Sequence, residues 1–234
     1  MRPDLPAPLC FLSFDFDGTL TDFVAADIHA LDTLRRTACA DVPQAAFEER
    51  AVEEIMAFHA RVETGLADPL RQDAERLGRT LAAYGVTLTE DHLGLYTRAL
   101  VDATVPVPGA AELLRDLRGA GVRLALLSNA YDGPAQRARV QACLPDVFEV
   151  VVIAGELGAL KPDPLPFRVM LDALGLPAGA GVYVGDSPEH DVRGAVAAGL
   201  SAWHVHAHPR VRERALAGGA ALSVAALADL PRPS

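Results

Sequence analysis

The sequence comprises 234 residues, of which 50% are hydrophobic and 22% are charged, and its formal net charge is −10 at pH 7. These values are typical of a globular chain of one or two domains and exclude a disordered or low-complexity protein. The excess of acidic side chains argues against a surface that binds a nucleic-acid polymer or an anionic membrane, because phosphate groups attract clustered positive charge.

The apolar runs of the chain are short, and none approaches the roughly 18 residues that a membrane-spanning helix requires. No cleavage-site pattern follows the first residues, so we expect no signal peptide. The cysteines Cys10, Cys39 and Cys143 are far apart and odd in number, which excludes a disulfide framework or a zinc knuckle. We expect three buried thiols and a protein of the reducing cytoplasm.

The first predicted strand spans residues 9–14, an apolar run that ends in acidic residues. Residues 21–104 contain no comparable run, and apolar side chains such as Ile28, Leu31 and Leu34 recur there at helical spacing. This block is too long for a crossover connection, so we predict that it is an inserted all-α domain. Five of its arginines are interpreted as surface charges, namely Arg61, Arg71, Arg76, Arg79 and Arg98.

From residue 105 onward, short apolar runs alternate with amphipathic stretches. Four further strands are predicted at residues 122–128, 149–154, 181–185 and 201–205. Helices are predicted at residues 110–118 and 166–174 and from Ser187 to Gly199. The tail from Val211 onward is predicted to form one helix and a short strand at residues 222–224. Large side chains at helical spacing are expected in the core: Met56, Phe58, Phe167 and Met170. The alternation predicts an α/β fold with a doubly wound parallel sheet, built from residues 1–20 and 105–234.

Two carboxylates directly follow the first strand, in the segment Asp15-Phe-Asp17-Gly-Thr19. A calcium EF-hand loop does not fit, because Leu20 stands where that loop requires glycine and Ala26 where it requires glutamate. A solvated turn explains one acidic residue at a strand end but not two followed by Gly-Thr. We interpret Asp15 and Asp17 as a functional pair.

Polar residues also follow two other predicted strands. Asp186 ends the strand before Ser187, and Asp191 lies in the first turn of the next helix, where acidic residues are common in any case. Ser128 and Asn129 end another strand and are a weak signal when taken alone.

These strand ends should meet, because ligands of open parallel sheets bind at the carboxyl ends of the strands. Asp15, Asp17, Asp186 and Asp191 would repel one another there, and oxygen ligands at this density favour Mg²⁺. Lys161 is the only lysine among 21 basic residues, which makes it a candidate to contact both a carboxylate and a phosphate. A chance surface lysine is the alternative.

The four motifs together resemble the haloacid dehalogenase superfamily, whose phosphatases carry Asp-x-Asp-Gly-Thr, Ser or Thr at a second strand end, Lys-Pro, and Gly-Asp-x-x-x-x-Asp. The resemblance covers residues 9–22 and 105–206 and implies a Rossmann-like catalytic core with a helical cap over residues 21–104. It implies that Asp15 is the nucleophile and Asp17 the general acid/base. It also implies that the phosphoryl group is bound by Ser128, Asn129 and Lys161. The implied Mg²⁺ ligands are the carboxylates of Asp15 and Asp186 and the backbone carbonyl of Asp17, with Asp191 in support.

Asp17 favours phosphate-ester chemistry within this superfamily, because the dehalogenases and phosphonate-cleaving members that the chain resembles lack the second aspartate. We expect a Mg²⁺-dependent phosphatase that hydrolyses a small-molecule phosphate monoester through an aspartyl-phosphate. Residues 129–139 and 153–161 look most like the nucleotidase and acylneuraminate-phosphatase branch. A phosphomutase of the same superfamily and a non-catalytic ligand-binding domain of the same fold remain as alternatives.

Overall fold

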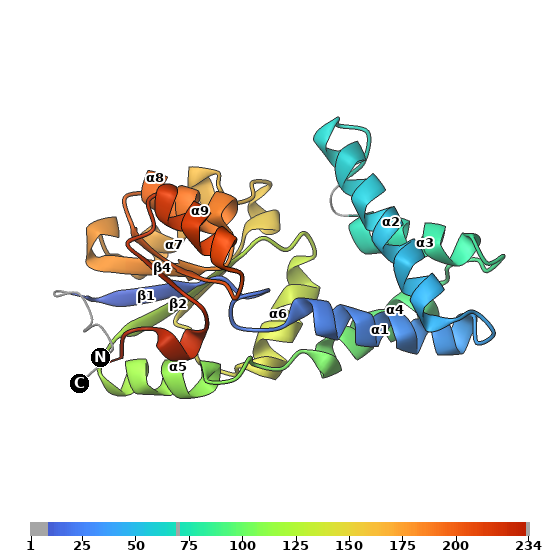
Figure 1. Cartoon of the computed structure of the whole chain (residues 1–234), viewed down its shortest axis with the longest axis horizontal. Coiled ribbons are helices and arrows are strands. Elements are labelled where there is room, and N and C mark those ends of the chain that lie inside the picture. Colours follow the sequence, from blue (N-terminus) through green and yellow to red (C-terminus); the bar gives the residue numbers. More distant parts are fainter. Residues whose placement is uncertain (1–8, 69–70, 233–234) are drawn as a thin grey trace. The chain divides into compact units, whose positions relative to one another are not determined.

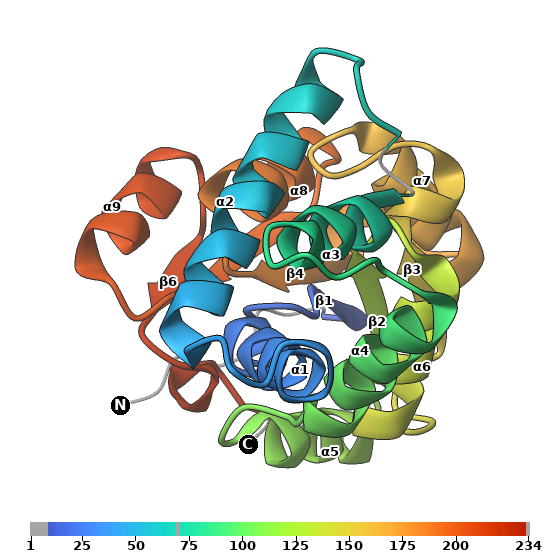
Figure 2. The same cartoon turned by 90° about the vertical axis from the view of Figure 1, so that its right-hand side faces the viewer.

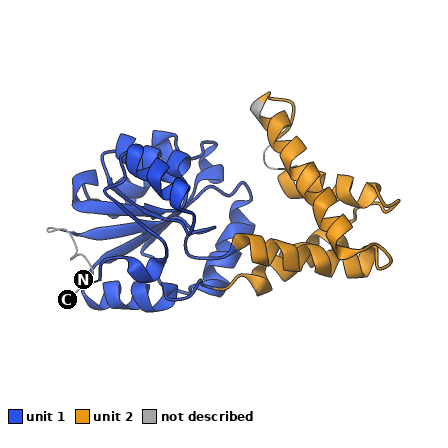
Figure 3. Ribbon diagram, viewed as in Figure 1, with its two compact units in different colours: residues 1–22, 106–234 blue, residues 23–105 orange. Residues whose placement is uncertain are grey.

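A computed structural model of the chain describes residues 9–68 and 71–232. The chain divides into two compact units, shown in different colours in Figure 3. Unit 1 consists of Met1–Asp22 and Pro106–Ser234, and unit 2 of Phe23–Val105.

Unit 1 is built on one parallel sheet of six strands with the order β3-β2-β1-β4-β5-β6, of which Figure 1 labels β1, β2 and β4. The strands are β1 (Phe11–Phe14), β2 (Arg123–Ser128), β3 (Val150–Ile153), β4 (Gly181–Gly185), β5 (Ser201–Val205) and β6 (Leu222–Val224). β1 lies at the centre, with β2 on one side and β4 on the other. The strand order reverses between β1 and β4, the position where ligands of such sheets bind.

Helices cover both faces of this sheet. They are α5 (Ala110–Gly119), α6 (Gly133–Cys143), α7 (Pro164–Leu174), α8 (Arg193–Ala197) and α9 (Pro209–Ala217). α5 and α6 pack on the face that carries Leu12 and Phe14, and α7, α8 and α9 pack on the opposite face, which carries Phe11 and Tyr183. β1 and β4 are buried throughout, and β2 and β5 beyond their first residue, which explains their almost continuous apolar sequences, whereas the edge strand β6 is half-buried. The predicted doubly wound parallel sheet is confirmed.

The helix predicted to start at Ser187 has an irregular first turn. Ser187 caps it as expected, since its hydroxyl accepts the His190 backbone N–H, but Pro188–Val192 is a π-helical turn that precedes α8. The Val192 amide bonds the Ser187 carbonyl five residues back, and the wider turn buries the Asp191 side chain.

Unit 2 contains α1 (Phe23–Ala38), α2 (Gln44–Glu63), α3 (Gln72–Ala82) and α4 (Glu90–Ala103) (Figure 2). No strand occurs in its described residues, 23–68 and 71–105. Its core includes Leu31, Leu34, Leu81 and Tyr96, which come from three different helices. The unit therefore has a hydrophobic core of its own.

Several placements by residue type were wrong. Met56 is 65% exposed, whereas Phe58, Phe167 and Met170 are buried as expected. Arg76 is buried rather than exposed, because its guanidinium forms a bidentate ion pair with Asp27 at 2.7 and 2.9 Å.

The cysteines also differ from the expectation of three buried thiols. Cys39 is buried and Cys143 is half-buried, but Cys10 is exposed because it precedes the first residue of β1. All three are free. Among residues 9–68 and 71–232, no helix is both long and apolar enough to cross a membrane.

Candidate active site

β1 and β4 deliver two aspartates to the point where the strand order reverses. Asp15 follows the last residue of β1, and its backbone N–H donates to the Val184 carbonyl at 2.9 Å. Asp186 follows the last residue of β4. Gly18 turns the chain after β1 with a φ of +86°, and a Cβ placed on it would lie 2.6 Å from Asp186 Oδ2. The glycine is therefore required both for the turn and for the approach of Asp186.

Lys161 lies at the centre of the site although it is 146 residues from Asp15 in the sequence. Its Nζ donates to Asp15 Oδ1 and Asp191 Oδ1, both at 2.7 Å, and contacts the Tyr183 hydroxyl at 2.8 Å and the Leu127 carbonyl at 3.1 Å. The lysine is 3% exposed, which contradicts a chance surface position. Leu127 lies in β2, Tyr183 in β4, Asp15 directly after β1 and Asp191 in the turn after β4, so the ammonium links the ends of three adjacent strands.

The side chain of Asn129 holds the backbone of Lys161. Its Oδ1 accepts the Lys161 N–H at 2.7 Å, and its Nδ2 donates to the Lys161 carbonyl at 3.0 Å. This two-point contact fixes the start of the Lys161–Pro162 segment, whose peptide bond is cis. The Asn129 amide is thus engaged within the protein.

Three carboxylates of the site form a group that fits a divalent cation. One oxygen from each of Asp15, Asp186 and Asp191 lies within 4.8 Å of the others. Hard oxygen donors at such a spacing suit Mg²⁺ better than softer metals. With all three ionised, the charge of Lys161 leaves an excess of negative charge, which a divalent cation would neutralise.

Burial and mutual repulsion perturb these groups. Burial raises the pKa of Asp15 well above its ordinary value, against the attraction of Lys161. Burial and then Asp191 raise the pKa of Asp186 to about 7. Burial alone would lower the pKa of Lys161, but Asp15 and Asp191 outweigh it and keep the ammonium charged. Strongly perturbed groups of opposite charge in one cluster are typical of functional sites.

His204, a buried residue of β5, supports this site. Its Nε2 lies 2.8 Å from the Asp186 carbonyl oxygen and its Nδ1 2.9 Å from the Ser223 hydroxyl. Since the carbonyl only accepts, Nε2 carries the proton and the serine donates to Nδ1. The imidazole therefore anchors the backbone of Asp186.

Asp17 faces α6 with partners that sequence reasoning did not identify. Its carboxylate accepts two hydrogen bonds from Arg139, at 2.6 and 3.1 Å, and one from Gln136 Nε2 at 2.8 Å. Gln136 Nε2 also lies 2.9 Å from Ser128 Oγ, so Ser128 and Asp17 share a partner. The spacing of Gln136 and Arg139, which puts both on one side of a helix, was the available signal.

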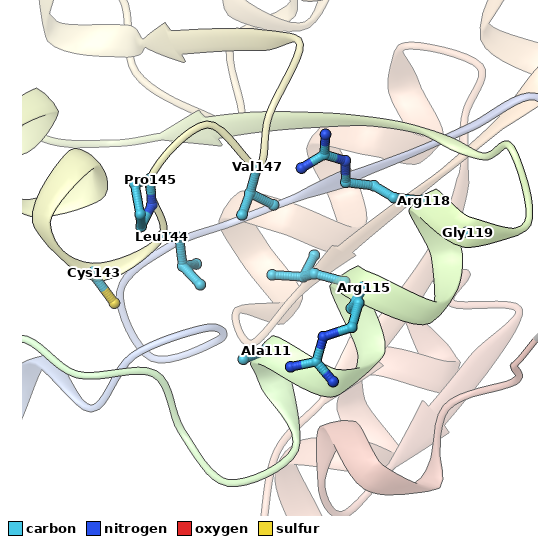
Figure 4. Close-up of a pocket in the computed structure, with 9 residues that line it drawn as sticks. Ala111, Arg115, Arg118, Gly119, Cys143, Leu144, Pro145 and Val147 are labelled. Carbon is cyan, nitrogen blue, oxygen red and sulfur yellow. The ribbon is translucent and has the colours of Figure 1, made fainter.

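A separate depression of about 630 Å³ lies between α5 and the segment after α6 (Figure 4). Its lining includes the apolar side chains of Leu114, Leu144 and Val147 and the charged side chains of Arg115 and Arg118. None of the predicted site residues lines it, and it has no part in the chemistry described below.

Comparison with known proteins identifies one enzyme family. The family model of haloacid dehalogenase-like hydrolases matches residues 12–199. A phosphoglycolate phosphatase of Rhodospirillum rubrum is 34% identical over 204 residues, which cover 80% of this chain and 75% of that protein. The pyrimidine 5'-nucleotidase YjjG of Escherichia coli is 31% identical over 123 residues, which cover 52% of this chain and 54% of that protein. The solved structure of the putative HAD-hydrolase YfnB of Bacillus subtilis superposes with a TM-score of 0.75 at 21% identity, covering 94% of this chain and 96% of that one.

A parallel sheet with carboxylates gathered around a buried lysine at its carboxyl edge is the architecture of an α/β enzyme with a charged active site. The chain belongs to the haloacid dehalogenase-like hydrolase family, as the family match and the Rhodospirillum rubrum relative show. Phosphoglycolate and phosphoserine phosphatases are among its relatives, and the enzyme is a phosphoric monoester hydrolase of that family. The resemblance drawn from the four motifs is confirmed.

Proposed function

We propose that the enzyme is a Mg²⁺-dependent phosphatase that hydrolyses a small-molecule phosphate monoester through an aspartyl-phosphate on Asp15. The observation that carries this proposal is the Lys161 ammonium, bonded to Asp15 and Asp191 at the carboxyl ends of β1 and β4. A cation in that position would neutralise a transferring phosphoryl group next to a carboxylate nucleophile. The named phosphatases among the relatives support the same chemistry.

Asp15 is the proposed nucleophile. A carboxylate oxygen of Asp15 forms a bond to phosphorus while the ester oxygen leaves with its electron pair and takes a proton from Asp17. Asp17 then removes a proton from water, which attacks phosphorus and breaks the bond to Asp15. The products are the alcohol and inorganic phosphate, and both aspartates return to their starting states.

Ser128, Asn129 and Lys161 are the proposed contacts of the phosphoryl oxygens. Lys161 supplies positive charge, and Ser128 a hydroxyl at the end of β2. The side-chain amide of Asn129 is held by Lys161, so its backbone N–H is the group available to an oxygen. These donors belong to strand ends that the sheet holds in register.

Mg²⁺ would be held by the carboxylates of Asp15 and Asp186 and by the backbone carbonyl of Asp17, with Asp191 supporting them. When bound, the ion supplies positive charge to the phosphoryl oxygens. The close grouping of the three carboxylates of Asp15, Asp186 and Asp191 supports this assignment, as does the magnesium named for the YfnB structure.

Unit 2 is the proposed cap domain and unit 1 the catalytic core. In this proposal the helical insertion selects the substrate while the core performs the chemistry. The three free cysteines support a cytoplasmic site of action.

The decisive test is ³¹P NMR of turnover on phosphoglycolate, a nucleoside monophosphate and a hexose phosphate, with Mg²⁺ and with EDTA. The first two substrates represent the relatives' named activities. Inorganic phosphate that accumulates in step with substrate loss, only with Mg²⁺, supports the proposal. An isomeric sugar phosphate that forms without inorganic phosphate would favour the phosphomutase, and full activity in EDTA would remove the metal from the mechanism.

A further inference from the structure

The carboxylate of Asp17 accepts a hydrogen bond from the Thr21 hydroxyl at 3.4 Å, and its shorter contacts all come from two side chains of α6, Gln136 and Arg139. Arg139 Nη2 donates to Asp17 Oδ1 at 2.6 Å, and Nη1 donates to Oδ2 at 3.1 Å. Gln136 Nε2 donates to the same Oδ2 at 2.8 Å. Both α6 side chains are 3% exposed, whereas the Asp17 side chain is 27% exposed. The Asp17 carboxylate is therefore in contact with two buried side chains while remaining partly accessible to solvent.

The side chains of Gln136 and Arg139 are themselves held in place by further contacts. Gln136 Oε1 accepts from Arg139 Nη1 at 2.7 Å, and the Arg139 guanidinium lies 5.4 Å from the centroid of the Phe16 ring. Asp132 caps α6 by accepting the Ala135 N–H at 2.9 Å. A planar guanidinium that is both stacked and bidentate leaves the carboxylate one favourable orientation.

We propose that Arg139 is a positioning residue for Asp17, and that Gln136 couples the Asp17 carboxylate to the Ser128 hydroxyl. This inference rests on the proposed function, in which Asp17 is the general acid/base and Ser128 contacts the phosphoryl group. One network then orients both the group that transfers the proton and the group that holds the phosphate. An error of about 1 Å in such an orientation costs up to about 10²-fold in rate.

The proposal is tested by a double-mutant cycle of Arg139→Met and Asp17→Asn, with kcat and KM measured on an alkyl phosphate. Arg139→Met is expected to lower kcat by roughly 10- to 10²-fold while KM changes by less than about threefold, because the arginine acts through Asp17. In the Asp17→Asn background the same substitution should lower kcat by less than about threefold. Arg139→Lys should recover only part of the rate, since an ammonium lacks the bidentate fork.

Arg137→Met provides the matched control. Arg137 lies on the same helix but pairs with Glu156 and is 47% exposed. Its substitution should leave kcat unchanged. Thermal unfolding of every variant shows that the protein is folded at the assay temperature, so a loss of rate is not a loss of native protein.

The outcomes separate this inference from the proposed function. A wild-type protein without phosphatase activity on any phosphate ester would overturn the proposed function and this role with it. An active wild-type protein in which the losses from Arg139→Met and Asp17→Asn multiply would overturn this inference alone, because the arginine would then act independently of Asp17. A loss in Arg139→Met that is confined to KM would overturn it as well.

Discussion

The ammonium of Lys161 lies 2.7 Å from Asp15 Oδ1, and both side chains are buried. A buried ion pair is costly to form unless each partner's remaining hydrogen-bonding capacity is satisfied. Here Asp191, Tyr183 and the Leu127 carbonyl complete the surroundings of the ammonium. The pair is therefore held in one geometry, which is the condition that a reacting carboxylate and its electrostatic partner must meet.

Lys161→Arg is expected to lower kcat by about 10²-fold or more although it preserves charge. The four partners lie at 2.7–3.1 Å from a single nitrogen, and a planar guanidinium cannot direct its donors to all of them. The check is steady-state kinetics together with the melting temperature. Arg168→Lys, a swap at an exposed position of α7, is the control and should be silent. Wild-type turnover in Lys161→Arg would show that the lysine has no special role.

Mg²⁺ should raise the melting temperature of the wild-type protein, because a ligand that binds only the folded state stabilises it, and Gly18→Ala should abolish this rise. The added Cβ would lie 2.6 Å from Asp186 Oδ2 and displace that carboxylate from the group of three. Gly121→Ala is the matched control, because Gly121 has a φ of +80° but no atom within 4 Å of the added Cβ. Both variants should lose about 1 kcal/mol or more of stability through backbone strain, but only Gly121→Ala should keep the response to Mg²⁺. An equal response in both would contradict the proposed role of Asp186.

The stabilisation by Mg²⁺ should grow as the pH rises from about 6 to about 8. Burial and Asp191 raise the pKa of Asp186 from its ordinary value of 3.8 to about 7. The metal-free folded protein therefore binds this proton more tightly than the unfolded chain, and its stability falls as the pH rises between those values. Mg²⁺ binds the ionised carboxylate, so protons compete with it below about pH 7. Melting temperatures with Mg²⁺ and with EDTA at both pH values measure the effect, and Asp186→Asn should weaken the pH dependence, leaving the part that comes from Asp15, whose pKa burial also raises. The same shift at both pH values would contradict it.

The sheet and the strand-end residues were predictable because each depends on local sequence. Apolar runs flanked by glycine identify the buried strands, and Asp15, Ser128 and Asp186 are placed at strand ends by those runs. In a parallel sheet, side chains at the carboxyl ends of adjacent strands must meet. Fold and site location therefore followed from one pattern.

Contacts made across the sheet or between helices were not predictable in this way. In the sequence Tyr183 is an ordinary strand residue, yet its hydroxyl lies 2.8 Å from the Nζ of Lys161, which is 22 residues away in the chain. Arg76 was misplaced because arginine is usually exposed, and its partner Asp27 is 49 residues away. Both cases require knowledge of which elements pack together, which a hydrophobic pattern alone does not contain.

Arg76→Met should lower the free energy of unfolding by about 3–5 kcal/mol, the range observed when one partner of a buried ion pair is removed. Asp27 would retain the Tyr96 hydroxyl at 2.6 Å but lose both bonds from the guanidinium. Urea denaturation measures the loss. Arg193→Met is the control, because Arg193 pairs with Glu189 at the surface, where the two side chains are 65% and 55% exposed. Its free energy of unfolding should change by less than about 1 kcal/mol. Equal effects of the two substitutions would show that the Arg76 network contributes no more than a surface pair.

Asp15→Asn and Asp17→Asn should fail at different steps. Asp15→Asn lacks the nucleophilic oxygen, so both turnover and covalent phosphorylation should disappear. Asp17→Asn should lose activity by about 10²-fold or more, because a general acid/base contributes about that much. A substrate with a good leaving group should still phosphorylate Asp15 without an acid, and the aspartyl-phosphate should then persist because no base activates water.

Rapid quenching followed by intact-protein mass measurement detects the bound phosphoryl group. Asp172→Asn, at an exposed position of α7, is the control and should turn over as the wild type does. A phosphorylated Asp15→Asn protein would assign the nucleophile elsewhere, and an Asp17→Asn protein that loses its phosphoryl group at the wild-type rate would remove the base role from Asp17.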